Sequence, residues 1–358
     1  MIAEATLKGY LLEEVLAWML RGSGYRLLVH ESQDPEELCM AGNGLCVRGR
    51  GADHQVDVLG EFAFTPAFSL PVRLFLEAKF TRQPCRLPVV RNAHVVIHDI
   101  NENFTHGPGS RLRKRYRYVY ALFSTSGFTL DAQDFALAQQ ISLVDLSGAS
   151  FSWLRDRVET AAADLLSAAR EYRIDRFPVN WMRGQLRRLL GTYPRPLDDE
   201  ALEPETSAHG FSRACQPMLG ALAEGLWEGG RNELLLGFPA APFIVPLVAD
   251  NVDRFLSYAR QHPDHVIRLR RYGRGAGAEW IAFPADDVEG YELTFSMPAR
   301  IEEWIAENDE RRTARTRQIK QRFLADMIIY RMHGDDLQTF QLHYQPGGLR
   351  QGRYGHQG

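Results

Sequence analysis

The chain has 358 residues, of which 45% are hydrophobic and 24% charged, an ordinary globular composition with enough apolar side chains for a sizeable core. Its 42 Lys and Arg against 45 Asp and Glu give a formal charge of −3, which excludes a histone-like polycation and an acidic solvating tail but not a local basic surface. Four scattered cysteines without a Cys-x-x-Cys pair exclude a disulfide framework and a thiolate zinc site, and they indicate a reduced, cytoplasmic protein. Because the first residues are acidic, we expect no signal peptide. Because no apolar run approaches ~20 residues, we expect no contact with a membrane.

Hydrophobic periodicity predicts alternating helices and strands over the first 175 residues. Prolines between the two central strands suit a hairpin connection, and the order of elements describes a mixed α/β sheet with helices on both faces. We expect helices at residues 6–21, 87–101, 130–140 and 150–172, and strands at 25–30, 55–64, 72–80, 116–124 and 141–146. The segment at 31–43 is expected to be a surface loop or a short helix.

A second, α+β domain is expected at residues 209–345. Before it, residues 176–208 are predicted to be a helix with Arg183, Arg187 and Arg188 on its polar side, followed by a Pro- and acid-rich linker. Within the second domain we expect strands at 233–238, 243–248, 265–271, 279–283 and 291–297, a helix at 251–262 and a charged helix at 299–330. Residues 346–358 are predicted to be a disordered tail.

The most informative segment is a strand that carries charge within an apolar sequence. Alternation along the strand puts Glu77 and Lys79 on one face, while Leu76, Ala78 and Phe80 face the core. Charges at the edge of a core need a partner, a metal or a function. If the preceding strand is an antiparallel neighbour, its Asp57 converges on Glu77.

Two converging carboxylates repel each other unless a divalent cation lies between them, and oxygen ligands favour Mg²⁺ or Mn²⁺. Such an ion can polarise a phosphodiester and lower the pKa of a bound water. Lys79 would orient that water or stabilise charge that develops on the phosphorus centre. The residues therefore predict a metal-dependent phosphodiesterase.

The spacing of Asp57 and Glu77-Ala78-Lys79 resembles the D-(x)n-E-x-K signature of the PD-(D/E)xK nuclease superfamily, and the surrounding sequence resembles its Mrr-like restriction endonuclease family. The chain departs from that family at His54-Gln55, where small residues usually precede the metal aspartate. The resemblance covers about residues 8–150, and its further matches are Gly9-Tyr10-Leu11-Leu12-Glu13, Gly24-Tyr25, Gly49-x-Gly51-Ala52-Asp53, and the late series 123–129, Ala132, Ala136 and 141–145.

The resemblance implies a restriction-endonuclease-like mixed sheet flanked by helices in residues 1–175, and a DNA endonuclease of restriction or anti-phage defence. Asp57 and Glu77 would be Mg²⁺ ligands, with the backbone carbonyl of Ala78 as a further ligand and Mn²⁺ as an alternative ion. Lys79 would position the attacking water, and Glu13 would be an accessory catalytic carboxylate, although Glu14 beside it offers a second choice.

Two basic segments have open interpretations. The first has five cations in seven residues and is either a solvated loop or a phosphate-binding surface, made of Arg111, Arg113, Lys114, Arg115 and Arg117. The second, at 311–322, holds six cations and no acid, and is a solvated helix, a nucleic-acid arm or a partner surface.

Alternative functions are a structure-specific nuclease of repair or recombination, and a non-cleaving nucleic-acid-binding subunit that retains the nuclease fold. The C-terminal domain would recognise DNA, a modified base, a second messenger or a partner protein of a defence system. A homodimer is expected because one such site cuts one strand, and a double-strand break needs two.

Overall fold

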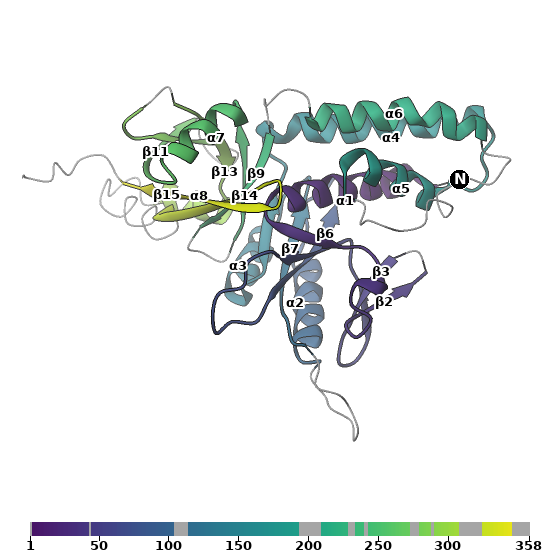
Figure 1. The fold of residues 1–358 in the computed structure, drawn as a ribbon, viewed down its shortest axis with the longest axis horizontal. Helices are drawn as coiled ribbons and strands as arrows, with labels where there is room; N and C mark the ends of the chain where they lie inside the picture. Colours follow the sequence, from purple (N-terminus) through teal and green to yellow (C-terminus); the bar gives the residue numbers. More distant parts are fainter. Residues whose placement is uncertain are drawn as a thin grey trace, which may run out of the picture.

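The structure is a computed structural model that describes residues 2–42, 44–103, 114–192, 209–227, 233–239, 243–272, 279–287, 290–307 and 324–345. It is a mixed α/β protein in which a helix-covered sheet adjoins a β-barrel (Figure 1). Within the described part of the chain, each helix is too short or too polar to cross a bilayer.

A five-stranded sheet forms the centre of the N-terminal part, with the strand order β1-β5-β6-β7-β8. β1, β5 and β6 are antiparallel neighbours, whereas β6, β7 and β8 run parallel. The hairpin predicted around the two prolines is confirmed, and so is the mixed sheet. The strands are β1 (Tyr25–Leu28), β5 (Val58–Phe62), β6 (Val72–Lys79), β7 (Arg117–Ser124) and β8 (Ser142–Asp145).

Helices cover both faces of this sheet because both faces are apolar. Leu74 and Leu76 of β6 pack with the core under α1, while Phe75 packs with the core under α2 and α3. In Figure 1, α4 and α6 lie side by side beyond α1, and α2 and α3 lie on the other side of the sheet. The helices are α1 (Glu4–Gly22), α2 (Leu87–Asn101), α3 (Leu130–Gln139), α4 (Ser152–Glu171), α5 (Val179–Leu190) and α6 (His209–Trp227).

Helix α6 was not expected from the sequence. It packs against α4 and α5, and its Phe211, Cys215 and Leu219 are buried in the same core as α1. The helix therefore completes the N-terminal core, although it follows the segment interpreted as a linker. Most of that segment, residues 193–208, lies outside the described residues.

A small antiparallel sheet begins within the segment at 31–43, which was interpreted as a loop or short helix, and extends beyond it. Leu38, Leu45 and Val47 of this sheet are buried against the face of the large sheet that α2 covers. A 3-10 turn (Glu31–Gln33) precedes its strands, which are β2 (Leu38–Ala41), β3 (Gly44–Arg48) and β4 (Asp53–Gln55). It leads the chain directly into Asp57.

The C-terminal part is a closed barrel with the strand order β10-β13-β12-β11-β15-β14-β9. Closure leaves no open sheet edge, and Trp280, Tyr291 and Phe295 fill its buried core. The elements are β9 (Glu233–Pro239), β10 (Val245–Ala249), α7 (Val252–Gln261), β11 (Asp264–Tyr272), β12 (Glu279–Pro284), β13 (Leu293–Ser296), α8 (Ala299–Glu307), β14 (Asp326–His333) and β15 (Asp336–Tyr344).

The helix expected at 299–330 is wrong at its C-terminal end. Residues 326–330 belong to β14, which pairs with β9 and β15, because alternating apolar side chains such as Met327 and Ile329 face the barrel core. The basic segment 311–322 and the tail 346–358 lie outside the described residues.

The barrel contacts the sheet unit through polar and aromatic groups. Arg300 at the start of α8 donates its backbone N–H to Gln133 Oε1 (2.9 Å) and pairs through Nε with Asp134 Oδ1 (2.8 Å). The rings of Phe62 and Tyr330 meet edge to face at 4.8 Å between centroids. The ring contact places β14 beside β5, and β14 also contacts α1.

A buried arginine organises the end of the sheet at which β6 begins. The Arg73 side chain is 1% exposed, and its guanidinium pairs with Asp34 (2.6 Å) and Glu61 (2.8 Å) and donates to the Tyr118 hydroxyl (3.0 Å). Arg26 pairs with the same Glu61 at 2.9 Å, but its side chain is 62% exposed.

We predict that Arg73→Met lowers the free energy of unfolding by about 3–5 kcal/mol, because it removes the buried cation from Asp34 and leaves Glu61 with only the exposed Arg26. Arg26→Met is the matched control and is expected to cost less than about 1 kcal/mol, since solvent screens that pair. Urea denaturation of both variants measures the difference. Equal losses of unfolding free energy in the two variants would contradict the conclusion that the buried Arg73 contacts stabilise the fold more than the exposed Arg26 pair.

Candidate active site

The register of β5 and β6 sets two carboxylates opposite each other. Val58 pairs with Leu76, so Asp57, one residue before β5, lies opposite Glu77. The Asp57 Oδ2 atom accepts a hydrogen bond from the Ala78 backbone N–H at 2.8 Å. Asp57 and Glu77 are therefore neighbours across antiparallel strands, as expected, and a side-chain-to-backbone bond holds Asp57 at Ala78.

Glu77 and Lys79 share one face of β6 and form an ion pair between Glu77 Oε1 and Lys79 Nζ. The other Glu77 oxygen accepts a hydrogen bond from the Tyr120 hydroxyl of β7. Burial, with the adjacent carboxylate, raises the pKa of Tyr120, so the phenol stays a proton donor. Burial works against the charged form of Lys79, but its Glu77 partner outweighs this and raises its pKa. Lys79 is accordingly a stable cation rather than a base.

Asp57 has an environment that disfavours its charge. Burial raises the pKa of Asp57, the hydrogen bond from Ala78 opposes this, and the negative charge of Glu77 adds to it. A cation beside Asp57 would relieve the penalty.

Helix α2 holds the turn that leads to Asp57. Asp99 accepts the backbone N–H groups of Gly51 (2.9 Å) and Ala52 (3.3 Å), and His54 Nε2 lies 2.7 Å from Asp99 Oδ2. A β-carbon at Gly49 would collide with the Asp99 carboxylate, so the turn requires glycine there. His54, where the chain departs from the family pattern, thus anchors the turn to α2.

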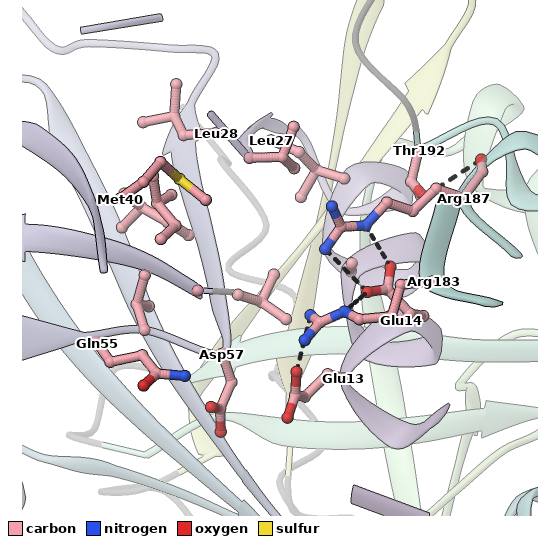
Figure 2. Close-up of a pocket in the computed structure, with 17 residues that line it drawn as sticks. Glu13, Glu14, Leu27, Leu28, Met40, Gln55, Asp57, Arg183, Arg187 and Thr192 are labelled. Atoms are coloured by element: carbon pink, nitrogen blue, oxygen red, sulfur yellow. Dashed lines mark hydrogen bonds and ion pairs between the residues drawn. The ribbon is translucent and has the colours of Figure 1, made fainter. Parts of the chain in front are cut away.

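The two neighbouring glutamates of α1 have different surroundings. Glu14 is buried and accepts from Arg183 Nε (2.6 Å) and Arg187 Nε (2.8 Å), whereas Glu13 Oε2 lies 2.8 Å from Arg183 Nη2. Figure 2 shows the Glu13 and Asp57 carboxylates directed into the same space, with Glu14 turned to the arginines. Glu13 is thus the one beside the site, and Glu14 ties α1 to α5.

Two of the three arginines expected on the polar side of the 177–190 helix face carboxylates rather than solvent. The side chains of Arg183 and Arg187 are only 14% and 22% exposed, because they face the carboxylates of α1. Arg188 is exposed, as expected for a solvated face.

Glu13 carries a proton over much of the neutral range. Burial raises its pKa to about 8; the attraction of Arg183 offsets only part of this, because Asp57 and Glu14 add negative charge. The cavity that these groups line has a volume of about 70 Å³, room for water or an ion rather than a large ligand.

The residues fit a loosely held hard cation rather than a metal cage. Among the residues that the structure describes, there is no group of three or more His, Cys, Asp or Glu side chains that could hold a metal ion. Asp57 and Glu77 supply two carboxylates on neighbouring strands, and Ala78, the residue after Glu77, donates its backbone N–H to Asp57. Mg²⁺ is commonly held by one or two carboxylates with waters and substrate phosphates completing its shell, so two suffice.

The described part of the first basic segment does not reach these carboxylates. Arg117 pairs with Val72 at the start of β6, and Glu77 pairs with Leu122, five residues further along β7. At ~3.3 Å per residue this separation is about 17 Å. Lys114, Arg115 and Arg117 therefore lie toward the other end of the sheet, while Arg111 and Arg113 lie outside the described residues.

Four side chains at or around the site were not predicted from the sequence to belong to it. Arg183 and Arg187 are spaced i, i+4, which signals one helix face but not the buried acid it meets. Tyr120 alternates with Tyr118 along β7, a pattern that marks a shared face without identifying Glu77 as a partner. Asp99 gave no signal, because only folding brings α2 beside the turn.

No protein-family model and no curated protein matches the chain. A crystal structure described as a protein of unknown function, AF1548, aligns with 60% of this chain and 98% of its own length, at 12% sequence identity and a TM-score of 0.30. A likeness this low carries no argument about fold or function.

We predict that Glu13 makes stability depend on pH. Its folded pKa of about 8 lies above the ordinary 4.5, so the folded state keeps a proton that the unfolded chain releases. The stabilisation is complete below about pH 4.5 and is lost as the pH rises through 8. Urea denaturation between pH 5 and 9 should show the stability of wild type falling relative to Glu13→Gln.

The matched control is Glu171→Gln, at an exposed position at the end of α4. Its stability difference from wild type should stay constant over the same range. A constant difference for Glu13→Gln as well would contradict the raised pKa.

Proposed function

We propose that this protein is a metal-dependent DNA endonuclease whose catalytic part, residues 1–175, has a restriction-endonuclease-like fold of the PD-(D/E)xK kind. The observation that carries the proposal is the placement of Asp57 opposite Glu77, with Lys79 on the same strand face as Glu77. The order α1, β1, β5, β6, α2, β7, with its antiparallel and then parallel pairing, supports it.

In this proposal Asp57 and Glu77, with the backbone carbonyl of Ala78, would hold Mg²⁺, or Mn²⁺ as an alternative. The ion, when bound, would lower the pKa of a water and neutralise charge on the phosphodiester. Lys79, as a cation, would orient the attacking water and stabilise developing negative charge. Tyr120 would keep Glu77 in place through its hydroxyl.

Glu13 would be the accessory carboxylate. With a pKa of about 8 it holds a proton near neutral pH and can donate it to a substrate oxygen. Arg183 orients it through Nη2, which lies 2.8 Å from Glu13 Oε2, so we assign Arg183 a positioning role.

The biological setting follows from the sequence resemblance alone. We propose that the protein acts in restriction or anti-phage defence in the cytoplasm. We further propose that it works as a homodimer and with a partner protein of a defence system.

A non-cleaving nucleic-acid-binding subunit is the second candidate. The observation that favours it is that both carboxylate oxygens of Glu77 already have partners, Lys79 and Tyr120. A cation would have to compete with both partners for the Glu77 oxygens.

The test is divalent-dependent nicking of supercoiled plasmid. Glu77→Ala and Lys79→Ala are each expected to slow cleavage at least about a hundredfold, because each removes a charge that acts at the reacting phosphate. Asp164→Asn, an exposed acid on α4, is the charge-matched control and should cut at the wild-type rate. EDTA should abolish cutting in both active proteins.

Equal cutting by wild type and both site variants would contradict the proposal and identify a contaminant. Absence of cutting with Mg²⁺ and Mn²⁺ on duplex, junction and flap substrates, with DNA binding retained, would favour the binding subunit. Preference for junctions or flaps over plain duplex would assign the enzyme to repair or recombination.

A further inference from the structure

A second and larger cavity lies where the barrel meets the sheet unit. Its volume is about 710 Å³, within the range of small-molecule sites, which commonly occur at interfaces between domains. We name it the arginine cavity, because Arg21, Arg26 and Arg331 are among the residues that line it.

The charge of these walls favours an anion. Arg21 of α1, Arg26 of β1 and Arg331 of β14 contribute positive charge from separate elements, and the acidic Asp335 opposes them. Arg26 is partly neutralised by Glu61 at 2.9 Å. Guanidinium groups on different elements around one cavity are suited to phosphate oxygens, which they can bind in pairs.

A glycine allows the Arg21 guanidinium to lie against the backbone. A β-carbon at Gly191 would come within 2.8 Å of Arg21 Nη1, and one at Gly22 would come within 3.4 Å of Arg331 Nη1. Arg21 Nη1 also donates to the Gly191 carbonyl. This hydrogen bond holds Arg21 at the wall of the cavity, and Arg331 Nη1 lies beside Gly22, where a β-carbon would make only ordinary van der Waals contact with it.

The remaining walls suit a planar ring. Trp18 is half-buried beside the arginines, and Leu234 and Met332 add apolar surface from the barrel. An indole and guanidinium groups together match a molecule with an aromatic base and phosphates, since bases stack on aromatic side chains. At about 710 Å³ the cavity is far larger than a lone phosphate requires.

We propose that the arginine cavity binds a mononucleotide, with its phosphates on Arg21 and Arg331 and its base against Trp18. The cavity shares Leu27 and Thr192 with the small cavity that Glu13 and Asp57 line. Arg21 also contacts Gly191 at the C-terminus of α5, the helix whose Arg183 holds Glu13. The nucleotide is thus connected to the candidate active site through α5.

Isothermal titration calorimetry on the full chain, without divalent cations, tests the proposal with ATP, GTP, CTP and UTP. At least one of these should bind, and tripolyphosphate and the matching nucleoside should each bind about tenfold or more weakly, because each offers half of the contacts. The readout is binding alone, so its outcome is independent of DNA cleavage.

Variants assign any binding to the cavity. Arg21→Gln and Arg331→Gln should each weaken the best nucleotide about tenfold or more, and Asp335→Asn should tighten it by removing a repulsive charge. Arg270→Gln, a half-exposed barrel arginine outside the cavity, is the matched control and should bind as wild type. Misfolding could also weaken binding in the arginine variants. It would not raise affinity, so tighter binding by Asp335→Asn assigns the effect to the charge of the cavity.

Several results would overturn the proposal. They are the absence of binding by all four nucleotides, unchanged affinity in both arginine variants, and affinity for tripolyphosphate equal to that for the best nucleotide. Displacement of the nucleotide by a short single-stranded DNA of higher affinity would overturn the small-molecule assignment.

Discussion

One register, that of β5 against β6, determines the candidate active site. The bond from the Ala78 N–H to Asp57 Oδ2 fixes Asp57 opposite Glu77, and alternation along β6 then puts Lys79 on the same face. A slip of one residue would send every side chain of the strand to the other face, so the apolar residues on both sides protect this register. Val58 and Leu76 in the α1 core and Leu59 and Phe75 in the α2 core enforce it.

The candidate active site also needs positive charges that compensate its buried acids. Glu13, Glu14 and Asp57 are all largely withdrawn from water, and buried acids without partners are costly. Two arginines of α5 provide the main compensation, and Lys79 provides it on the opposite side, beside Glu77. The compensation is incomplete, since the pKa values of Glu13 and Asp57 remain raised. The site therefore combines fixed positive charge with acids that a further cation would stabilise. Helix α5 is part of this site, although its residues lie outside the motif of Asp57, Glu77 and Lys79.

Local patterns predicted the sheet and the meeting of Asp57 with Glu77, because strand alternation and a hairpin are short-range properties. They did not predict what depends on distant contacts. The segment 326–333 follows a charged stretch and becomes a strand only through pairing with β9 and β15. The barrel closes partly through the parallel pairing of β11 with β15, which are more than seventy residues apart in the chain. Similarly, Arg183 and Arg187 have the sequence pattern of a solvated helix face, and only the tertiary structure brings Glu14 to them.

The most direct test of a cation between Asp57 and Glu77 is anomalous X-ray scattering from crystals of the protein grown or soaked with Mn²⁺. We expect an anomalous peak within coordination distance, about 2.1 Å, of oxygens from both carboxylates, with Lys79 displaced from its position in the Glu77 ion pair. The absence of a peak there at saturating Mn²⁺, with Lys79 and Tyr120 still bound to Glu77, would contradict a metal-dependent active site.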